Sequence, residues 1–169
     1  QFIHPQKWTN DIDYLNKDVI VIGSGATAIT LIPSLSEKAK HVTMLQRSPT
    51  YLMNLAKKDK FTNFLFRFTP SKFAHFISRW KYIIRQIYFY GISKRRPKEV
   101  KKFIKNEIKN SLSKGFDIEK HFNPKYNPWD ERVCVVVDND LYESINQGKC
   151  NVVTENINSF NKNGILLES

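Results

Sequence analysis

Short apolar runs bounded by polar residues mark the first part of the chain, and a helical pattern separates two of them. Residues 18–22 (DVIVI) and 41–46 (HVTMLQ) have the length and β-branched composition of buried parallel strands. Residues 26–38 between them predict a helix that Pro33 would kink. Its apolar positions recur at helical spacing, at Ile29, Ile32 and Leu35. This order of strand, helix and strand predicts a βαβ unit.

Helical periodicity replaces strand character between residues 57 and 125. The first part of this segment predicts one long amphipathic helix. Pro97 fits the first turn of a second helix, which ends before Gly115. The apolar residues of both helices have the spacing of core positions, so we expect the helices to pack on the sheet. These residues are Phe73, Phe76, Ile77, Trp80, Ile83, Ile84, Ile87 and Tyr88 in the first helix, and Val100, Phe103, Ile104 and Ile108 in the second.

Strand character returns at residues 132–137 (RVCVVV) and 150–154, with a short helix predicted over 141–145 between them. Two further apolar runs flank a hairpin signal, in the order 157–160, Asn163-Gly164 and 165–167. The simplest fold is α/β, with an open parallel sheet and a helical insertion between its second and third strands.

The glycine-rich segment GSGATA follows the first predicted strand and opens the first predicted helix, which is the context that a dinucleotide-binding turn requires. Gly23 would permit the tight turn, Gly25 would let the backbone approach a pyrophosphate, and Ala28 would keep the helix close to the strand. The alternative is an ordinary strand-to-helix turn. We predict a Rossmann-like fold whose phosphate-binding residues are Gly23, Ser24, Gly25, Ala26, Thr27 and Ala28.

The end of the second strand indicates which dinucleotide would bind. An NAD site usually has an acidic residue there, whereas this chain has Gln46, Arg47 and Ser48. A carboxylate would repel a 2′-phosphate, and a guanidinium can pair with it in a forked geometry. The sequence therefore predicts NADP(H), with Arg47 as the main contact and Ser48 as a hydroxyl donor. The alternative for Arg47 is a solvated surface residue.

The composition and charge allow several kinds of anionic partner. The chain has 169 residues and a net charge of +11, and about nineteen of its Lys and Arg residues lie between residues 57 and 125. Such a balance fits nucleic acid, a membrane surface or a phosphorylated cofactor. Cys134 and Cys150 have no CxxC or zinc spacing, so we place both in the core of a cytoplasmic protein. We assign no metal, because His41, His75 and His121 show no ligand spacing.

Several segments together resemble the flavin-containing monooxygenases of the Baeyer–Villiger type. His4 and Trp8 keep the spacing of the later half of the family fingerprint FxGxxxHxxxWP, with Thr9 in place of the final Pro. The similarity continues through VIVIGSGATAITLIPSL, VTMLQRSPTY, SRWKYIIRQ, SKRRP and HFNPKYNPWDERVCVV, and so covers nearly the whole chain. It looks closest to the group that includes the ethionamide-activating monooxygenase. The chain lacks an initiating Met, so we expect it to begin inside a longer protein.

The resemblance implies the NADPH domain of a two-dinucleotide-binding flavoprotein, with FAD held mostly by segments outside this chain. Residues 1–17 would be the fingerprint linker with His4 and Trp8, and 57–125 the helical insertion. The Rossmann-like domain would comprise residues 18–56 and 126–169. In the family, NADPH reduces FAD, molecular oxygen gives a peroxyflavin, and a ketone becomes an ester or lactone, with sulfide oxidation as a side activity. No catalysis is expected from these 169 residues alone.

By motif position, the family arginine that stabilises the peroxyflavin anion is Arg132. A permanently charged guanidinium suits a place where negative charge develops. The alternative is an arginine at a strand start that pairs with Asp130 or Glu131. Many relatives have Lys before this arginine as a second phosphate contact. Glu131 occupies that position here, which leaves more of the phosphate binding to Arg47.

Two other classes of protein remain as alternatives. The run at Lys94, Arg95 and Arg96 fits a basic module that binds nucleic acid or a membrane surface. We favour a solvated helix face and expect no nucleic-acid partner, and we leave weak peripheral membrane contact open. The second class is a heteroatom flavin monooxygenase or another NAD(P)/FAD oxidoreductase. A disulfide reductase would need a redox cysteine pair, which the sequence lacks. The sequence leaves the oligomeric state open.

Overall fold

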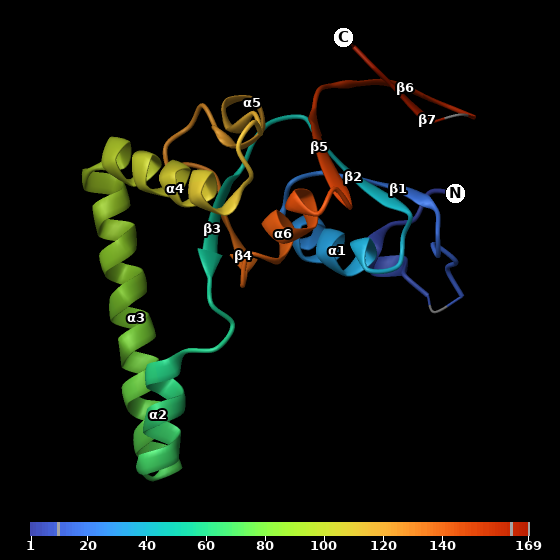
Figure 1. Ribbon diagram of the computed structural model, residues 1–169. Helices are drawn as coiled ribbons and strands as arrows, with labels where there is room; N and C mark the ends of the chain where they lie inside the picture. The colour runs from blue at the N-terminus through green and yellow to red at the C-terminus, as the bar shows by residue number, and fades with distance from the viewer. Residues whose placement is uncertain (10, 163, 169) are drawn as a thin grey trace.

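The computed structural model describes residues 1–9, 11–162 and 164–168, and it contains the predicted βαβ unit (Figure 1). Strand β1 (Asp18–Ile22) pairs in parallel with β2 (His41–Gln46), and α1 (Ala26–Ser36) connects them. Strand β5 (Cys150–Thr154) pairs with the other edge of β2, also in parallel. The three strands have the predicted bounds, whereas α1 ends two residues earlier than expected and contains Pro33 without a break.

A second parallel pair joins two segments that are distant in sequence. Strand β4 (Val133–Val137) starts one residue later than predicted and pairs with β3 (Tyr51–Leu55). Strand β3 was not predicted, so the expectation of an insertion between the second and third strands is wrong. The insertion lies between β3 and β4, and the parallel strands form a sheet of three and a sheet of two.

Helix α1 connects the two sheets, because it packs against both β2 and β4. Its predicted apolar face is confirmed, since Ile29, Ile32 and Leu35 are almost completely buried. The short predicted helix is α6 (Asp140–Asn146), which lies beside α1 (Figure 1). Cys134 and Cys150 are buried free thiols, as expected, and burial raises the pKa of Cys150 to about 12.

The insertion contains four helices, of which two had been predicted. They are α2 (Lys60–Phe68), α3 (Ser71–Arg95), α4 (Pro97–Ser111) and α5 (Ile118–Phe122). Helix α4 packs against β3 through its buried residues Val100, Ile104 and Ile108, whereas Phe103 on the same predicted face is 54% exposed. Helix α3 extends away from the sheets, and α2 lies beside its far half (Figure 1). None of the described helices is long and apolar enough to cross a membrane.

The apolar face of α3 does not pack on the sheet, which corrects the sequence-based expectation. The buried residues of this helix are the small ones, Ala74, Ser78 and Ser93. The helix contacts α2 and α4. Six of the eight residues predicted as core are exposed: Phe73, Phe76, Trp80, Ile84, Ile87 and Tyr88.

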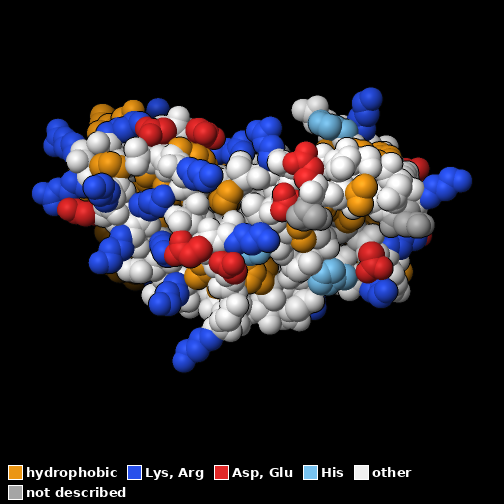
Figure 2. Space-filling model, turned by 90° about the horizontal axis from the view of Figure 1, so that it is seen from above, with side chains coloured by type: hydrophobic (Ala, Val, Ile, Leu, Met, Phe, Trp, Pro, Cys, Tyr) orange, Lys and Arg blue, Asp and Glu red, His pale blue; other side chains and the backbone are white. Residues whose placement is uncertain are grey.

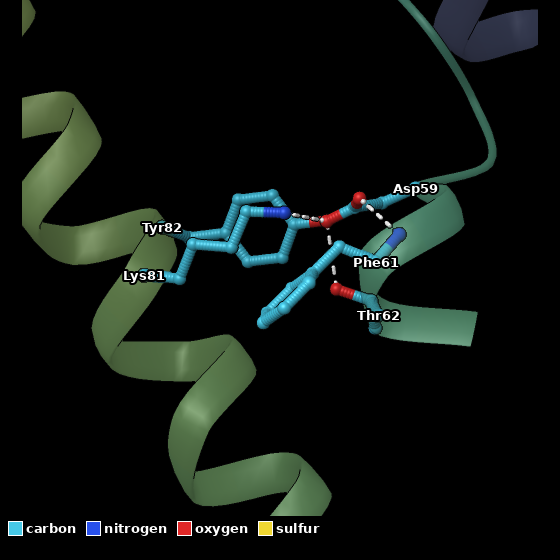
Figure 3. Close-up of polar contacts among 5 residues, drawn as sticks. All are labelled: Asp59, Phe61, Thr62, Lys81 and Tyr82. Carbon is cyan, nitrogen blue, oxygen red and sulfur yellow. Dashed lines mark hydrogen bonds and ion pairs between the residues drawn. The ribbon is translucent and has the colours of Figure 1, made fainter. Parts of the chain in front are cut away.

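Asp59 connects α2 to α3 through a set of polar contacts (Figure 3). Its carboxylate caps α2 by accepting from the N–H of Phe61 (3.1 Å) and also accepts from the hydroxyl of Thr62 (2.7 Å). From α3, Tyr82 donates its hydroxyl (2.8 Å) and Lys81 forms an ion pair. The contacts with Lys81, Thr62 and Tyr82, of which Lys81 has the largest effect, lower the pKa of Asp59 well below its usual range. The two helices therefore meet as a defined hairpin.

The chain ends in an antiparallel hairpin of β6 (Ile157–Asn161) and β7 (Gly164–Leu167), as predicted. Asn163 of the predicted turn lies outside the described residues. The first residues form a loop with one short 3-10 turn at Pro5–Lys7. Phe2 meets Phe160 edge to face, with 5.2 Å between the ring centres, so the first residues contact the C-terminal hairpin.

Candidate functional site

The glycine turn lies at the carboxyl end of β1, beside the end of β2. Gly23 has φ +118°, a conformation that favours glycine, and its N–H donates to the carbonyl of Leu45 (2.7 Å). This bond fixes the turn to the last residues of β2. A Cβ atom added at Gly23 or Gly25 would meet nothing within 4 Å. The backbone of the turn therefore faces open space, as a bound phosphate group requires.

The first turn of α1 can receive an anion. Gly25 is the N-cap and makes no side-chain capping bond, so no side chain occupies the position in front of the first N–H groups. Ala26 and Thr27 are exposed, whereas Ala28 is buried against the strands, as its predicted packing role requires. The predicted turn is therefore open on its outer side and packed on its inner side, which fits a dinucleotide phosphate.

A cavity of about 590 Å³ brings five of the predicted site residues together. Gly23 and Ser24 line it from the glycine turn, Arg47 and Ser48 from the end of β2, and Arg132 from the residue before β4. Arg47 and Arg132 are both exposed, and neither takes part in an ion pair among the described residues. Two guanidinium groups that have no ion-pair partner among the described residues favour an anionic ligand beside them.

The cavity also carries two carboxylates. Glu155 follows β5, beside the end of β2, and Glu168 follows β7 in the C-terminal hairpin; both line the cavity. The side-chain amide of Asn156 donates to Glu168 (2.8 Å), which keeps that carboxylate on the hairpin. A phosphate would be repelled on this side, so the phosphates belong at the glycine turn and Arg47. Sugar hydroxyl groups, which can donate to a carboxylate, suit the hairpin side.

Two hydrogen bonds with neutral hydroxyl groups hold Arg132 and do not neutralise its charge. Its Nε donates to the hydroxyl of Thr50 (3.2 Å), and its carbonyl accepts from the hydroxyl of Tyr126 (3.3 Å). Asp130, one of the two partners proposed in the alternative interpretation, pairs instead with Lys94 (2.7 Å). Glu131 is exposed and does not line the cavity. The guanidinium is therefore positioned by a neutral group and keeps its full charge for another anion.

Thr50 was missed by the sequence interpretation, although it connects three parts of the site. Its side chain is 1% exposed, and its hydroxyl lies 2.9 Å from that of Ser24 and accepts from Arg132. The Ser24 hydroxyl also donates to the carbonyl of Ser48 (3.3 Å). Ser24 is thus turned inward, where it fixes the glycine turn to the loop after β2. A threonine in a Ser-Pro-Thr loop has no spacing signal that would reveal this role.

Removal of the Thr50 hydroxyl should loosen this connection. We expect Thr50→Val to lower the free energy of unfolding by about 1–3 kcal/mol, because it leaves buried polar groups without a partner. If the complete enzyme oxygenates a substrate, the variant should also form less product per NADPH oxidised, because Arg132 loses its positioning contact. Thr50→Ser keeps the hydroxyl and should restore that ratio. Thermal unfolding and the product-to-NADPH ratio check both parts, and an unchanged ratio in Thr50→Val would contradict the positioning role.

Gln46 is not placed at the cavity, which corrects its predicted role as a cofactor contact. Its side chain is 1% exposed and lies inside the protein. The amide nitrogen donates to the carbonyl of His121 (2.7 Å) and to the hydroxyl of Thr154 (2.9 Å). Gln46 therefore joins β2 to β5 and α5. The chain reaches the cavity only at the next residue, Arg47.

The two predicted fingerprint residues lie in the loop before β1. His4 accepts the N–H of Gln6 through Nδ1 (3.3 Å) and caps the short 3-10 turn. Trp8 meets Tyr14 edge to face, with 5.6 Å between ring centres, and lines a second cavity together with Lys38. That cavity is at the amino end of β1, opposite the glycine turn. The structure thus separates Trp8 from the phosphate-binding residues, and the linker role of both residues stays a prediction.

The chain resembles known monooxygenases along its whole length. It is 46% identical over 168 residues to the FAD-containing monooxygenase EthA of Mycobacterium tuberculosis, and the match covers 99% of this chain. It is 45% identical over 170 residues to the probable FAD-binding monooxygenase AlmA of Acinetobacter baylyi. The chain is similar along its whole length to FAD-containing monooxygenases. It spans about a third of these relatives, 34% in both cases. No protein-family model matches the chain.

Solved structures of similar fold are Baeyer–Villiger monooxygenases, as the sequence resemblance implied. An open structure of cyclohexanone monooxygenase matches 98% of this chain with a TM-score of 0.68, at 17% identity and over 40% of that protein. An OTEMO complex with FAD and NADP matches 98% of the chain with a TM-score of 0.64, at 18% identity and over 38% of that protein. The predicted α/β, Rossmann-like fold is thereby confirmed.

Proposed function

We propose that this chain is the NADPH-binding part of an FAD-dependent monooxygenase. The observation that carries the proposal is one cavity lined by the glycine turn, Arg47 and Arg132. Sequence identity of 46% to an FAD-containing monooxygenase supports the same class. In this proposal, residues 1–17 are the linker, 18–56 and 126–169 bind the nucleotide, and 57–125 are the helical insertion.

The chain's own residues bind and orient the cofactor. The N–H groups at the start of α1 bind the pyrophosphate, and the open space above Gly23 and Gly25 lets it approach the backbone. Arg47 and Ser48 bind the 2′-phosphate at the end of β2. Glu168 keeps phosphates away from the hairpin side of the cavity. The bound NADPH and FAD supply hydride transfer and oxygen activation.

Arg132 is the residue of this chain that we assign to catalysis. Thr50 accepts from its Nε, and the guanidinium lines the cavity without an ion pair among the described residues. A preorganised positive charge stabilises negative charge that develops beside it during the reaction. Its side chain lines the same cavity as the phosphate-binding turn, as a residue beside the nicotinamide end of a bound dinucleotide would.

The proposed reaction inserts an oxygen atom from molecular oxygen into a ketone to give an ester or lactone, with sulfides as further substrates. The fold supports this choice, since the similar solved structures include cyclohexanone monooxygenase. The second candidate is a heteroatom monooxygenase or another NAD(P)/FAD oxidoreductase, because the relatives are named only as FAD-containing or FAD-binding monooxygenases.

The test uses the product of the complete reading frame. We expect it to bind NADPH in a titration and, with FAD and oxygen, to convert a cyclic ketone to its lactone and a sulfide to its sulfoxide. Product analysis by mass spectrometry distinguishes the two reactions. Sulfoxide without lactone, across several ketones, would favour the heteroatom class. Failure to bind NADPH would refute the proposal for this chain.

A further inference from the structure

An apolar stripe on α3 faces solvent instead of the protein core. Its side chains are 49–68% exposed, and they are Phe73, Phe76, Trp80, Ile84, Ile87 and Tyr88. They recur every three to four residues, so they share one side of the helix, which differs from the side of the buried residues Ala74 and Ser78. At about 1.5 Å per residue the stripe is about 24 Å long. An apolar patch of this length on a solvent-exposed protein surface marks an interaction site.

The stripe is surrounded by positive charge. Residues 57–98 contain twelve Lys and Arg residues and one acidic residue, Asp59. Within the described residues, only Lys81, Lys94 and Arg96 of these cations have an acidic partner. Figure 2 shows Lys and Arg side chains gathered with apolar ones at the end of the molecule that carries α3 and α4. The surface therefore combines exposed aromatic residues with excess cations.

The shape of this region suits a flat partner. Helices α2 and α3 extend away from the two sheets (Figure 1), so a planar surface could meet their exposed apolar side chains. Asp59 joins the two helices through Phe61, Thr62, Lys81 and Tyr82 (Figure 3). Phe64 and Phe68 on α2 are also exposed, and their rings are 4.7 Å apart. The hairpin is thus a preformed unit with aromatic residues on both helices.

We propose that the α2–α3 hairpin binds the surface of a bilayer that contains anionic phospholipids. The apolar stripe would enter the boundary between headgroups and acyl chains, and the surrounding Lys and Arg side chains would bind the headgroups. A basic helix with a broad apolar face and aromatic residues has the composition of an interfacial membrane helix. Each cation near an anionic surface adds to the attraction, which weakens as salt is raised.

The stripe fits a lipid surface better than nucleic acid or an uncharged protein segment. Binding of single-stranded nucleic acid uses aromatic rings as stacking platforms, whereas Ile84 and Ile87 are aliphatic and are 61% and 67% exposed. A covering segment of the same polypeptide would bury the stripe but would not require the surrounding charge. Anionic lipids match both the apolar and the charged part of the surface.

The test measures vesicle binding by the product of the complete reading frame. In flotation assays at low salt, we expect binding to phosphatidylcholine vesicles with one third phosphatidylglycerol to exceed binding to pure phosphatidylcholine at least tenfold. Half a molar salt should remove most of this difference. The double variant Trp80→Ser, Ile84→Ser should bind at least tenfold more weakly. Leu166→Ser changes a residue of similar exposure on β7 and should bind like the wild type.

Further measurements test whether something other than lipid covers the apolar stripe. NADPH affinity must be unchanged in the double variant, which shows that the protein still folds. Tryptophan quenching by iodide, taken as the difference between wild type and Trp80→Phe, should show Trp80 accessible without vesicles and shielded with anionic vesicles. A Trp80 that is shielded without lipid would mean that another segment or a second copy covers the stripe. That result would overturn the proposal. Vesicle binding by the double variant equal to that of the wild type would also overturn it, as would binding of RNA by a protein that does not bind the vesicles.

Discussion

Replacing Arg132 with alanine in the complete enzyme should lower the rate of substrate oxygenation at least about a hundredfold, while most of the NADPH oxidation continues. The reason is that Arg132 supplies a positive charge where the reaction develops negative charge, whereas Arg47 and the glycine turn bind NADPH without it. The measurement is the amount of oxygenated product per NADPH oxidised, with hydrogen peroxide determined in the same samples.

Arg132→Lys is the matched control for this prediction. It keeps the positive charge but loses the planar guanidinium that donates to Thr50 while facing the cavity. We expect partial activity, above that of the alanine variant. If Arg132→Ala formed product at the wild-type rate, Arg132 would have only a structural role beside Thr50 and Tyr126.

Changing Arg47 to glutamate should reverse the preference of the complete enzyme for NADPH over NADH. The variant replaces a cation at the end of β2 with the acidic residue that NAD sites usually carry there. Loss of a charge-assisted contact and gain of repulsion should raise the KM for NADPH by about a hundredfold, since such contacts contribute about 1.5–3 kcal/mol. The KM for NADH should change much less. Initial rates over a range of both nucleotides give this ratio.

Lys149→Glu is the control for the change in charge. Lys149 is exposed at the opposite end of the same sheet, immediately before β5, and it does not line the cavity. It alters the net charge as Arg47→Glu does, so any general electrostatic effect on NADPH would appear in both variants. If Arg47→Glu kept the wild-type preference, Arg47 would be the solvated surface residue of the alternative interpretation.

The local pattern was sufficient for the βαβ unit and its turn. Residues 18–46 carry their own signals, because apolar runs, helical spacing and the two glycines lie within one short stretch. The predicted α4, α6, β5 and C-terminal hairpin were found for the same reason. Gly23 and Arg47 meet at one cavity because the carboxyl ends of β1 and β2 lie at the same edge, whereas Arg132 precedes β4 and is held at this cavity by Thr50.

The features that were missed depend on contacts between distant segments. Strand β3 (YLMNL) lacks a clear two-residue alternation, and it is stabilised by β4 about eighty residues later. Likewise, spacing showed that Phe76, Trp80 and Ile84 share one face of α3, but not that this face would be exposed. Gln46 was misplaced because the last two residues of β2 are both buried, so the strand does not alternate at its end.

The burial of Gln46 has a consequence for the affinity of the site. Folding has already immobilised the backbone at the end of β2, through the bonds of Gln46 to His121 and Thr154 and of Glu155 to the Gln46 carbonyl. The next residue, Arg47, therefore starts from a rigid base and loses only side-chain freedom when it meets an anion. The entropy lost on binding is thus smaller than it would be for an arginine on a flexible loop.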